Sequence, residues 1–355
     1  MESILYQHIP KLDAESKMLL ILMCKDADNR KKYNKPLLDM VRDYGVSKPQ
    51  ILKSLFQLKE LGIIEHASTS TEPRKPGRPV SSYKINLELF PLWNKTLKWN
   101  FEPFVEARLQ SLCLTNSRRV KLANRLLLIL LASKADQAGT VDSVSFSELS
   151  YWMGCTMNRI QSIVKKLRQE GLLSYYIPGI SHQLIGKHRA VYFLNLRRLG
   201  KTQIKIVLSM DLPRTNTIIS LMDFSGRGYD FQNKVLRGRS LEGFVYYWLN
   251  KQQVTSNMTL QIDYLVEKHF VGLLNKGKLS ISSTIEFYRR YIALGFTNVK
   301  VNDKYKAEMI ELLSHRAKKI CDEIFYMQSV RPELKRCHLS LRYNSSNDKA
   351  LLFTD

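Results

Sequence analysis

The sequence lacks the local motifs that identify the common enzyme classes. It contains no Gly-x4-Gly-Lys-Ser/Thr phosphate loop, no Gly-x-Ser-x-Gly nucleophile turn and no His-Glu-x-x-His metal helix. Its five cysteines are scattered without a Cys-x-x-Cys pair, and no histidine cluster has the spacing of a zinc site. We therefore expect a protein that is not an enzyme, binds no cofactor or metal, and keeps its thiols free in a reducing compartment.

Long apolar runs and acidic residues are also scarce. The longest apolar run, Leu126 to Ala132, is too short to cross a bilayer. Met1 to Leu5 has no basic region followed by an apolar core, so we expect no signal peptide. Only 32 acidic residues stand against 55 Lys and Arg, which gives a formal net charge of +23. This balance favours a polyanionic partner over a membrane, and we expect a cytoplasmic, nucleoid-associated protein.

One pattern occurs twice in the chain at a fixed offset and without a gap. Two glycines, a hydroxyl residue and a short strand pattern all coincide, which chance alone rarely produces together. The matches include Gly45 on Gly154, Ser47 on Thr156, Gly62 on Gly171, and residues 83–87 on residues 192–196.

Each copy predicts three helices followed by two strands around a loop. Apolar residues at a spacing of three and four predict the third helix, and a glycine ends the second and third helices. Ser47 and Thr156 are expected to cap the third helices through their hydroxyls. In the first copy the helices are expected at 17–24, 36–44 and 47–61 and the strands at 63–66 and 82–87. In the second copy the helices are expected at 121–133, 147–153 and 157–170 and the strands at 172–177 and 190–196.

Residues 45–64 and 154–173 carry a resemblance to the winged helix-turn-helix family, which includes the MarR-like bacterial regulators. The order of three helices and a two-stranded hairpin with a long loop is the plan of that family. The resemblance covers a little over half of the chain. It implies that the third helix of each copy enters the major groove of DNA with its N-terminal side chains at the base edges.

The residues that the resemblance places against DNA lie off the buried stripe of each third helix. Asn and Gln can pair bidentately with adenine and Arg with guanine, whereas lysines at these positions suit phosphates. The alternative is a solvated polar face, which any surface helix shows. The candidates are Ser47, Lys48, Gln50, Lys53 and Ser54 in the first copy, and Thr156, Met157, Asn158, Arg159, Gln161, Ser162 and Lys165 in the second.

The loop of the first copy contains Pro-Arg-Lys-Pro-Gly-Arg-Pro at 73–79, whose last five residues resemble an AT-hook. We expect Arg74, Lys75, Gly77 and Arg78 to contact DNA, with Arg78 in the narrow minor groove of an A·T-rich tract. The alternative is a stiff basic loop that touches only phosphate. The loop of the second copy adds the candidates Lys187 and Arg189.

The remaining segments predict packing rather than chemistry. Residues 91–117 are too apolar for a flexible tether, so we expect a linker helix between the copies; an exposed partner surface is the alternative. After residue 201 the repeat stops, and a strand at 203–210 and helices at 241–252, 259–274, 282–294 and 304–327 are expected. The last of these helices has apolar residues along one side, and this apolar side suits packing or a homodimer interface.

These patterns predict a fold that is mainly α with small β-hairpins. Two tandem winged-helix domains are expected at 1–90 and 118–200, an apolar linker helix at 91–117, and a mainly helical C-terminal domain at 201–355. The expected partner is double-stranded DNA, and a sequence-specific transcriptional regulator is the leading interpretation. Two alternatives stay open. One is a plasmid- or phage-type replication initiator, to which the likeness is architectural only. The other is a scaffold whose winged helices bind protein.

Overall fold

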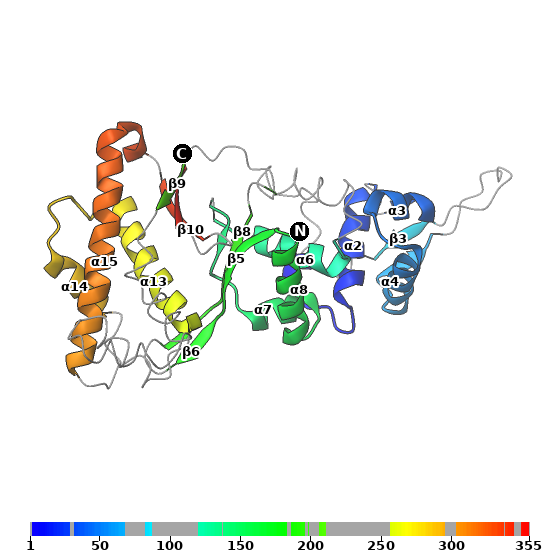
Figure 1. Cartoon of the computed structure of the whole chain (residues 1–355). Coiled ribbons are helices and arrows are strands. Elements are labelled where there is room, and N and C mark those ends of the chain that lie inside the picture. The colour runs from blue at the N-terminus through cyan, green and yellow to red at the C-terminus, as the bar shows by residue number, and fades with distance from the viewer. Residues whose placement is uncertain are drawn as a thin grey trace. The chain divides into compact units, whose positions relative to one another are not determined.

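A computed structural model of the chain shows a mainly helical protein with small antiparallel sheets (Figure 1). The predicted fold class is confirmed at this level. The residues divide into two compact units: Met1–Ala135, Val144–Leu173 and Leu194–Lys201 form unit 1, and Asp136–Ser143, Ser174–Phe193 and Thr202–Asp355 form unit 2. The structure describes residues 2–28, 32–67, 82–86, 120–136, 138–182, 186–195, 198, 206–210, 256–294, 303–336, 338–343 and 349–354.

The first copy of the repeat has all its elements in unit 1. The predicted helices and strands are confirmed, and a short strand is added between the first two helices. The sheet is antiparallel with the order β1-β3-β2, so β3 is central, with Tyr33 opposite Tyr83 and Ile64 opposite Ile85. The elements are α2 (Ala14–Asp26), β1 (Lys32–Tyr33), α3 (Leu37–Tyr44), α4 (Lys48–Glu60), β2 (Ile64–His66) and β3 (Tyr83–Ile85).

The second copy repeats the element order and the order of the sheet. Its three helices belong to unit 1 and almost all of its sheet, ordered β4-β8-β5, belongs to unit 2. A second hairpin, β6 with β7, lies in the chain where a plain loop was predicted. The elements are α6 (Leu122–Ala132), β4 (Thr140–Val141), α7 (Phe146–Met153), α8 (Met157–Gln169), β5 (Leu173–Ile177), β6 (Ile180–His182), β7 (Gly186–His188) and β8 (Val191–Leu194).

The helix ends follow from local chemistry. Gly45 and Gly154 end α3 and α7 in the left-handed conformation, with φ of 58° and 62°. Thr156 caps α8 as predicted, because its Oγ1 accepts a hydrogen bond of 3.4 Å from the backbone N–H of Arg159. Ser47 occupies the N-cap position of α4 without a side-chain cap hydrogen bond, so the predicted hydroxyl cap is wrong there.

The first helices of the two copies, α2 and α6, pack against one another within unit 1. Every residue from Ser16 to Cys24 on α2 and from Leu122 to Leu131 on α6 is buried. A helix that is enclosed on all sides has no polar face, and this explains why both sequences are apolar nearly all round. The two copies therefore share one core.

Two buried cations cross between the copies in opposite directions. Lys17 of α2 donates to the carbonyl of Trp152 in the last turn of α7, and Arg125 of α6 donates to the carbonyl of Tyr44 at the end of α3, at 2.5 Å. Both side chains are at most 3% exposed. The last carbonyls of a helix lack intrahelical partners and carry the negative end of its dipole, so a cation suits them. The exchange is reciprocal, as in the interface of a two-fold dimer.

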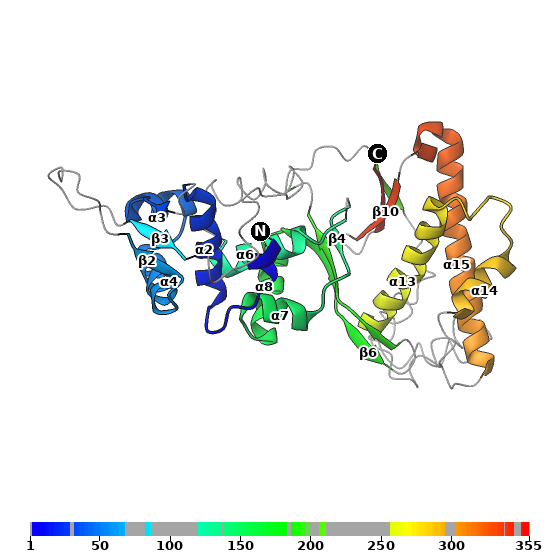
Figure 2. The same cartoon turned by 180° about the vertical axis from the view of Figure 1, so that it is seen from behind.

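Unit 2 contains three helices that lie side by side, as Figures 1 and 2 both show. Three of the predicted C-terminal helices are confirmed, and so is the strand predicted at 203–210. The core between the helices includes Phe270, Tyr288, Met309, Leu313 and Cys321. The elements are β9 (Ile206–Met210), α13 (Ser256–Asn275), α14 (Ile285–Leu294), α15 (Asp303–Val330), the 3-10 helix η4 (Pro332–Arg336), β10 (His338–Tyr343) and β11 (Lys349–Thr354).

A buried ion cluster joins α13 to α15. Arg316 donates to Asp263 at 2.5 Å and to Glu267 at 2.8 Å, and all three side chains are at most 9% exposed. The last strands form a sheet of order β10-β11-β9. The predicted linker helix at 91–117 and the helix at 241–252 lie outside the described residues. None of the helices that the structure describes is long and apolar enough to cross a membrane.

Candidate nucleic-acid interface

The exposed side of α8 is polar and basic. Ile160, Ile163, Val164 and Leu167 point into the core, and every predicted contact residue of this helix is exposed. The sequence of α8 holds four cations and no acid. The exposed candidates are Thr156, Met157, Asn158, Arg159, Gln161, Ser162 and Lys165.

Arg159 has an acidic neighbour that the sequence did not predict. Its guanidinium forms an ion pair with Glu15, which lies in the first turn of α2. The side chain of Arg159 is 42% exposed and that of Glu15 is 17% exposed. Glu15 therefore neutralises the arginine that was expected to read guanine and fixes one side of its guanidinium.

The third helix of the first copy presents a different face. Ser47, Lys48 and Lys53 are exposed, and Gln50 is half-buried. Ser54 is fully buried, with its Oγ 3.3 Å from Nε2 of Gln50. The prediction that Ser54 faces DNA conflicts with this position, because a small hydroxyl can turn into the core beside Leu55, and we leave it out of the candidate face.

Sequence reasoning missed two exposed apolar residues on α4. Leu52 is 46% exposed and Phe56 is 63% exposed. The signal was present, because both residues lie off the buried stripe of Ile51, Leu55 and Leu58. The two third helices therefore share a backbone plan but not a surface chemistry.

Of the candidate residues on the two loops, only those of the second copy lie among the described residues. Lys187 on β7 is exposed, and so is Arg189, which donates to the carbonyl of Ser143. Nε2 of Gln261 on α13 donates to the carbonyls of Pro178 at 2.8 Å and Arg189 at 3.0 Å. The base of the β6–β7 hairpin is thus fixed to the C-terminal helices. Arg74, Lys75, Gly77 and Arg78 lie outside the described residues.

The N-terminal segment contacts both third helices. The carbonyl of Lys11 accepts a hydrogen bond of 2.6 Å from Nε2 of Gln57 on α4. A Cβ on Gly154, before α8, would lie 2.5 Å from the carbonyl oxygen of Leu12. Three residues further on, Glu15 pairs with Arg159. A single stretch of chain therefore connects the candidate surfaces of the two copies.

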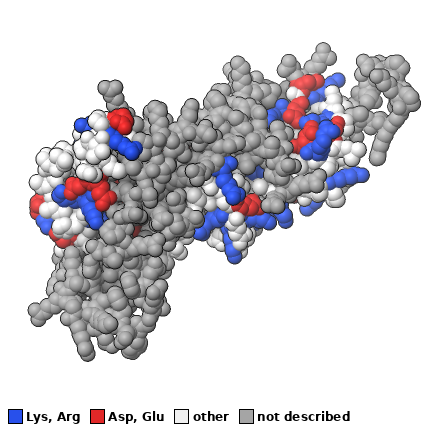
Figure 3. Space-filling view, turned by 45° about the horizontal axis from the view of Figure 1, so that its top comes forward, with Lys and Arg blue, Asp and Glu red and all other residues white. Residues whose placement is uncertain are grey.

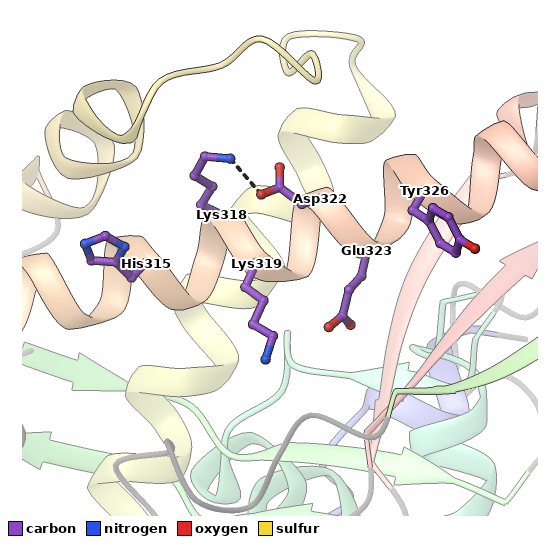
Figure 4. A pocket seen from close by; sticks show the side chains of 6 residues that line it. All are labelled: His315, Lys318, Lys319, Asp322, Glu323 and Tyr326. Atoms are coloured by element: carbon purple, nitrogen blue, oxygen red, sulfur yellow. Dashed lines mark hydrogen bonds and ion pairs between the residues drawn. The ribbon is translucent and has the colours of Figure 1, made fainter.

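An open pocket on α15 carries mixed charge and no evident reactive group (Figure 4). It is lined by His315, Lys318, Lys319, Asp322, Glu323 and Tyr326. Lys318 pairs with Asp322 at 2.6 Å, and Lys319 and Glu323 project to the same side of the helix. Figure 3 likewise shows acidic and basic side chains next to each other on the described surface, so charge alone does not outline the interface. No group of three potential metal ligands occurs among the described residues.

Comparison with known proteins found no match for the chain. No protein-family model matches the chain, and neither a curated protein nor a solved structure is significantly similar to it. The interpretation of the site depends on its residues.

Proposed function

We propose that the chain is a sequence-specific double-stranded DNA-binding protein with two winged helix-turn-helix units. Two observations support the fold assignment. Both copies have the order helix, strand, helix, helix, strand, strand, and the second copy adds the β6–β7 hairpin between its last two sheet strands. In both sheets the last strand is central and pairs with the short strand that follows the first helix, in the orders β1-β3-β2 and β4-β8-β5. A transcriptional regulator is the function we favour.

The exposed face of α8 carries the proposal. Asn158 and Gln161 have the amide groups that pair bidentately with adenine, and Arg159 can pair with guanine once it leaves Glu15. Lys165 lies one turn beyond Gln161, where a phosphate contact would fix the register. The helix itself contributes four cations and no acid, and Glu15 of α2 pairs with one of those cations, so a net positive charge remains that suits the phosphates along a DNA groove.

Selection of duplexes from a random-sequence pool by the full chain tests the proposal. We expect an enriched sequence whose affinity falls steeply between 50 and 200 mM salt, as about one counterion is released for each phosphate contact. Asn158→Ala should relax the choice of base at one position at a cost of about 1–3 kcal/mol. Lys165→Ala should weaken all sequences alike and lower the salt slope by about 0.9. Lys319→Ala, on α15, is the matched control and should change neither.

Binding that selects no sequence and does not respond to salt would refute the proposal. If a sequence is enriched, its positions in the genome distinguish a replication initiator from a transcriptional regulator. Tandem copies beside an A·T-rich tract would indicate a replication initiator, and a single site over a promoter would indicate a regulator. Dimerisation through the C-terminal domain stays a prediction, and sedimentation equilibrium of the full chain measures it.

A further inference from the structure

At two matched positions the two third helices carry side chains of opposite chemistry. On α4 the exposed residues Leu52 and Phe56 stand four residues apart and therefore lie one above the other on the helix surface. The repeat matches them with Gln161 and Lys165 on α8. Where the second copy offers an amide and an ammonium, the first copy offers only hydrocarbon.

Cations border this apolar pair. Lys48 lies one turn before Leu52, and Lys53 stands three residues before Phe56, so both are neighbours on the helix surface. Both lysines are exposed, and the only acid of α4 is its last residue, Glu60. The exposed side of α4 is thus an apolar strip with a basic border.

This charge pattern disfavours a second copy of the chain as the occupant. If two copies met through this face, each would bring Lys48, Lys53 and a single acid, Glu60, so cations would outnumber acids across the interface and disfavour it. A duplex fits the pattern better. In the major groove, A·T pairs expose the C5 methyl group of thymine, and phosphates line both edges of the groove.

We propose that Leu52 and Phe56 contact thymine methyl groups, so that the half-site of the first copy is chosen by apolar contact and is rich in thymine. The inference rests on the proposed function and adds the kind of half-site. The second copy reads its half-site mainly through hydrogen-bonding groups on α8, where Met157 is the one exposed large apolar residue. A single chain would then recognise two half-sites by two different kinds of contact.

Replacement of thymine by deoxyuridine tests the proposal, since it removes the methyl group and leaves the base-pairing groups unchanged. The probe is the duplex enriched by the full chain, and the half-site of α8 is the one whose base preference relaxes in Gln161→Ala. Deoxyuridine in the other half-site should weaken binding about four-fold for each contacted methyl, the equivalent of one buried CH₂ group. The same replacement in the half-site of α8 should have less effect.

The double variant Leu52→Ala/Phe56→Ala should bind the thymine and deoxyuridine duplexes equally. Ile281→Ala removes a similarly exposed aliphatic side chain in unit 2 and should keep the full difference. Equal affinity of the unchanged protein for both duplexes would overturn the inference while DNA binding stands. Loss of self-association in the double variant, with its methyl dependence intact, would assign the strip to a protein contact instead. Failure to enrich any duplex would refute the proposed function itself.

Discussion

Substitution of alanine at Gly154 should destabilise the protein more than the same change at Gly62. Both glycines follow a helix in the left-handed conformation, with φ of 62° and 66°. An L-residue pays about 1–2 kcal/mol for that conformation at either position. The smaller entropy of the unfolded alanine chain offsets part of this cost equally in both variants.

The surroundings of the two glycines differ, which makes Gly62 the matched control. A Cβ at Gly62 meets no atom within 4 Å, whereas one at Gly154 lies 2.5 Å from the carbonyl oxygen of Leu12. That oxygen belongs to the backbone and cannot rotate away, so the N-terminal segment must shift. Overpacking of this kind costs about 1–3 kcal/mol. We therefore expect Gly154→Ala to cost about 1–3 kcal/mol more than Gly62→Ala, with the loss at Gly62 at most about 1–2 kcal/mol.

Urea unfolding followed by circular dichroism measures both losses, with equal slopes required for the comparison. Equal losses in the two variants would show that the N-terminal segment does not lie against the turn before α8. The contact between Glu15 and Arg159 would then lose its support as well, because the same segment leads into Glu15.

Buried and paired charges should respond to substitution in ways that the structure defines. Burial lowers the pKa of Lys17 from 10.5 to about 7, so between these values the folded state binds fewer protons than the unfolded state and its stability rises with pH. The free energy of unfolding, taken relative to that of Lys17→Met, should rise by about 2 kcal/mol from pH 7 to pH 9 in urea titrations; a constant difference would mean that the ammonium stays charged. Glu15→Gln should release Arg159 and strengthen binding to the enriched duplex by about 0.2–1 kcal/mol, as measured by fluorescence anisotropy, because the guanidinium no longer has to leave an acid before it meets the base; an unchanged affinity contradicts this. Arg316→Met should cost about 3–5 kcal/mol in thermal or urea unfolding, because two buried carboxylates lose the cation that they share; a loss below about 1 kcal/mol would argue against a buried cluster.

The helices and turns were predictable because their signals are local. Apolar residues at a spacing of three and four define α4 and α8, and glycine at the ends of α3 and α7 permits a left-handed residue. The strands β1 and β4 were not predicted. Each has two residues, too few to show an alternation, and each pairs with a strand far along the chain.

The side-chain partners of the site could not be read from the sequence. Glu15 looks like an ordinary acid in the first turn of a helix, and only the fold brings it to Arg159. The cations inside α2 and α6 did leave a signal, since a charged residue in an otherwise apolar helix requires a buried acceptor. The acceptors include a carbonyl of the other copy for each cation, together with those of Leu5 and Gln7 for Lys17 and of Val120 for Arg125, and backbone carbonyls have no signature in the sequence.

The reciprocal contacts of Lys17 and Arg125 also bear on how the protein responds to its own concentration. Each copy supplies the counter-group for a charge that the other has buried, and both copies are parts of the same polypeptide. Their association is therefore intramolecular, and dilution does not separate them in the way that it separates the subunits of a homodimer. A ligand that engages both copies would therefore meet a preassembled pair even at very low protein levels, because the pairing of the copies does not depend on the protein concentration.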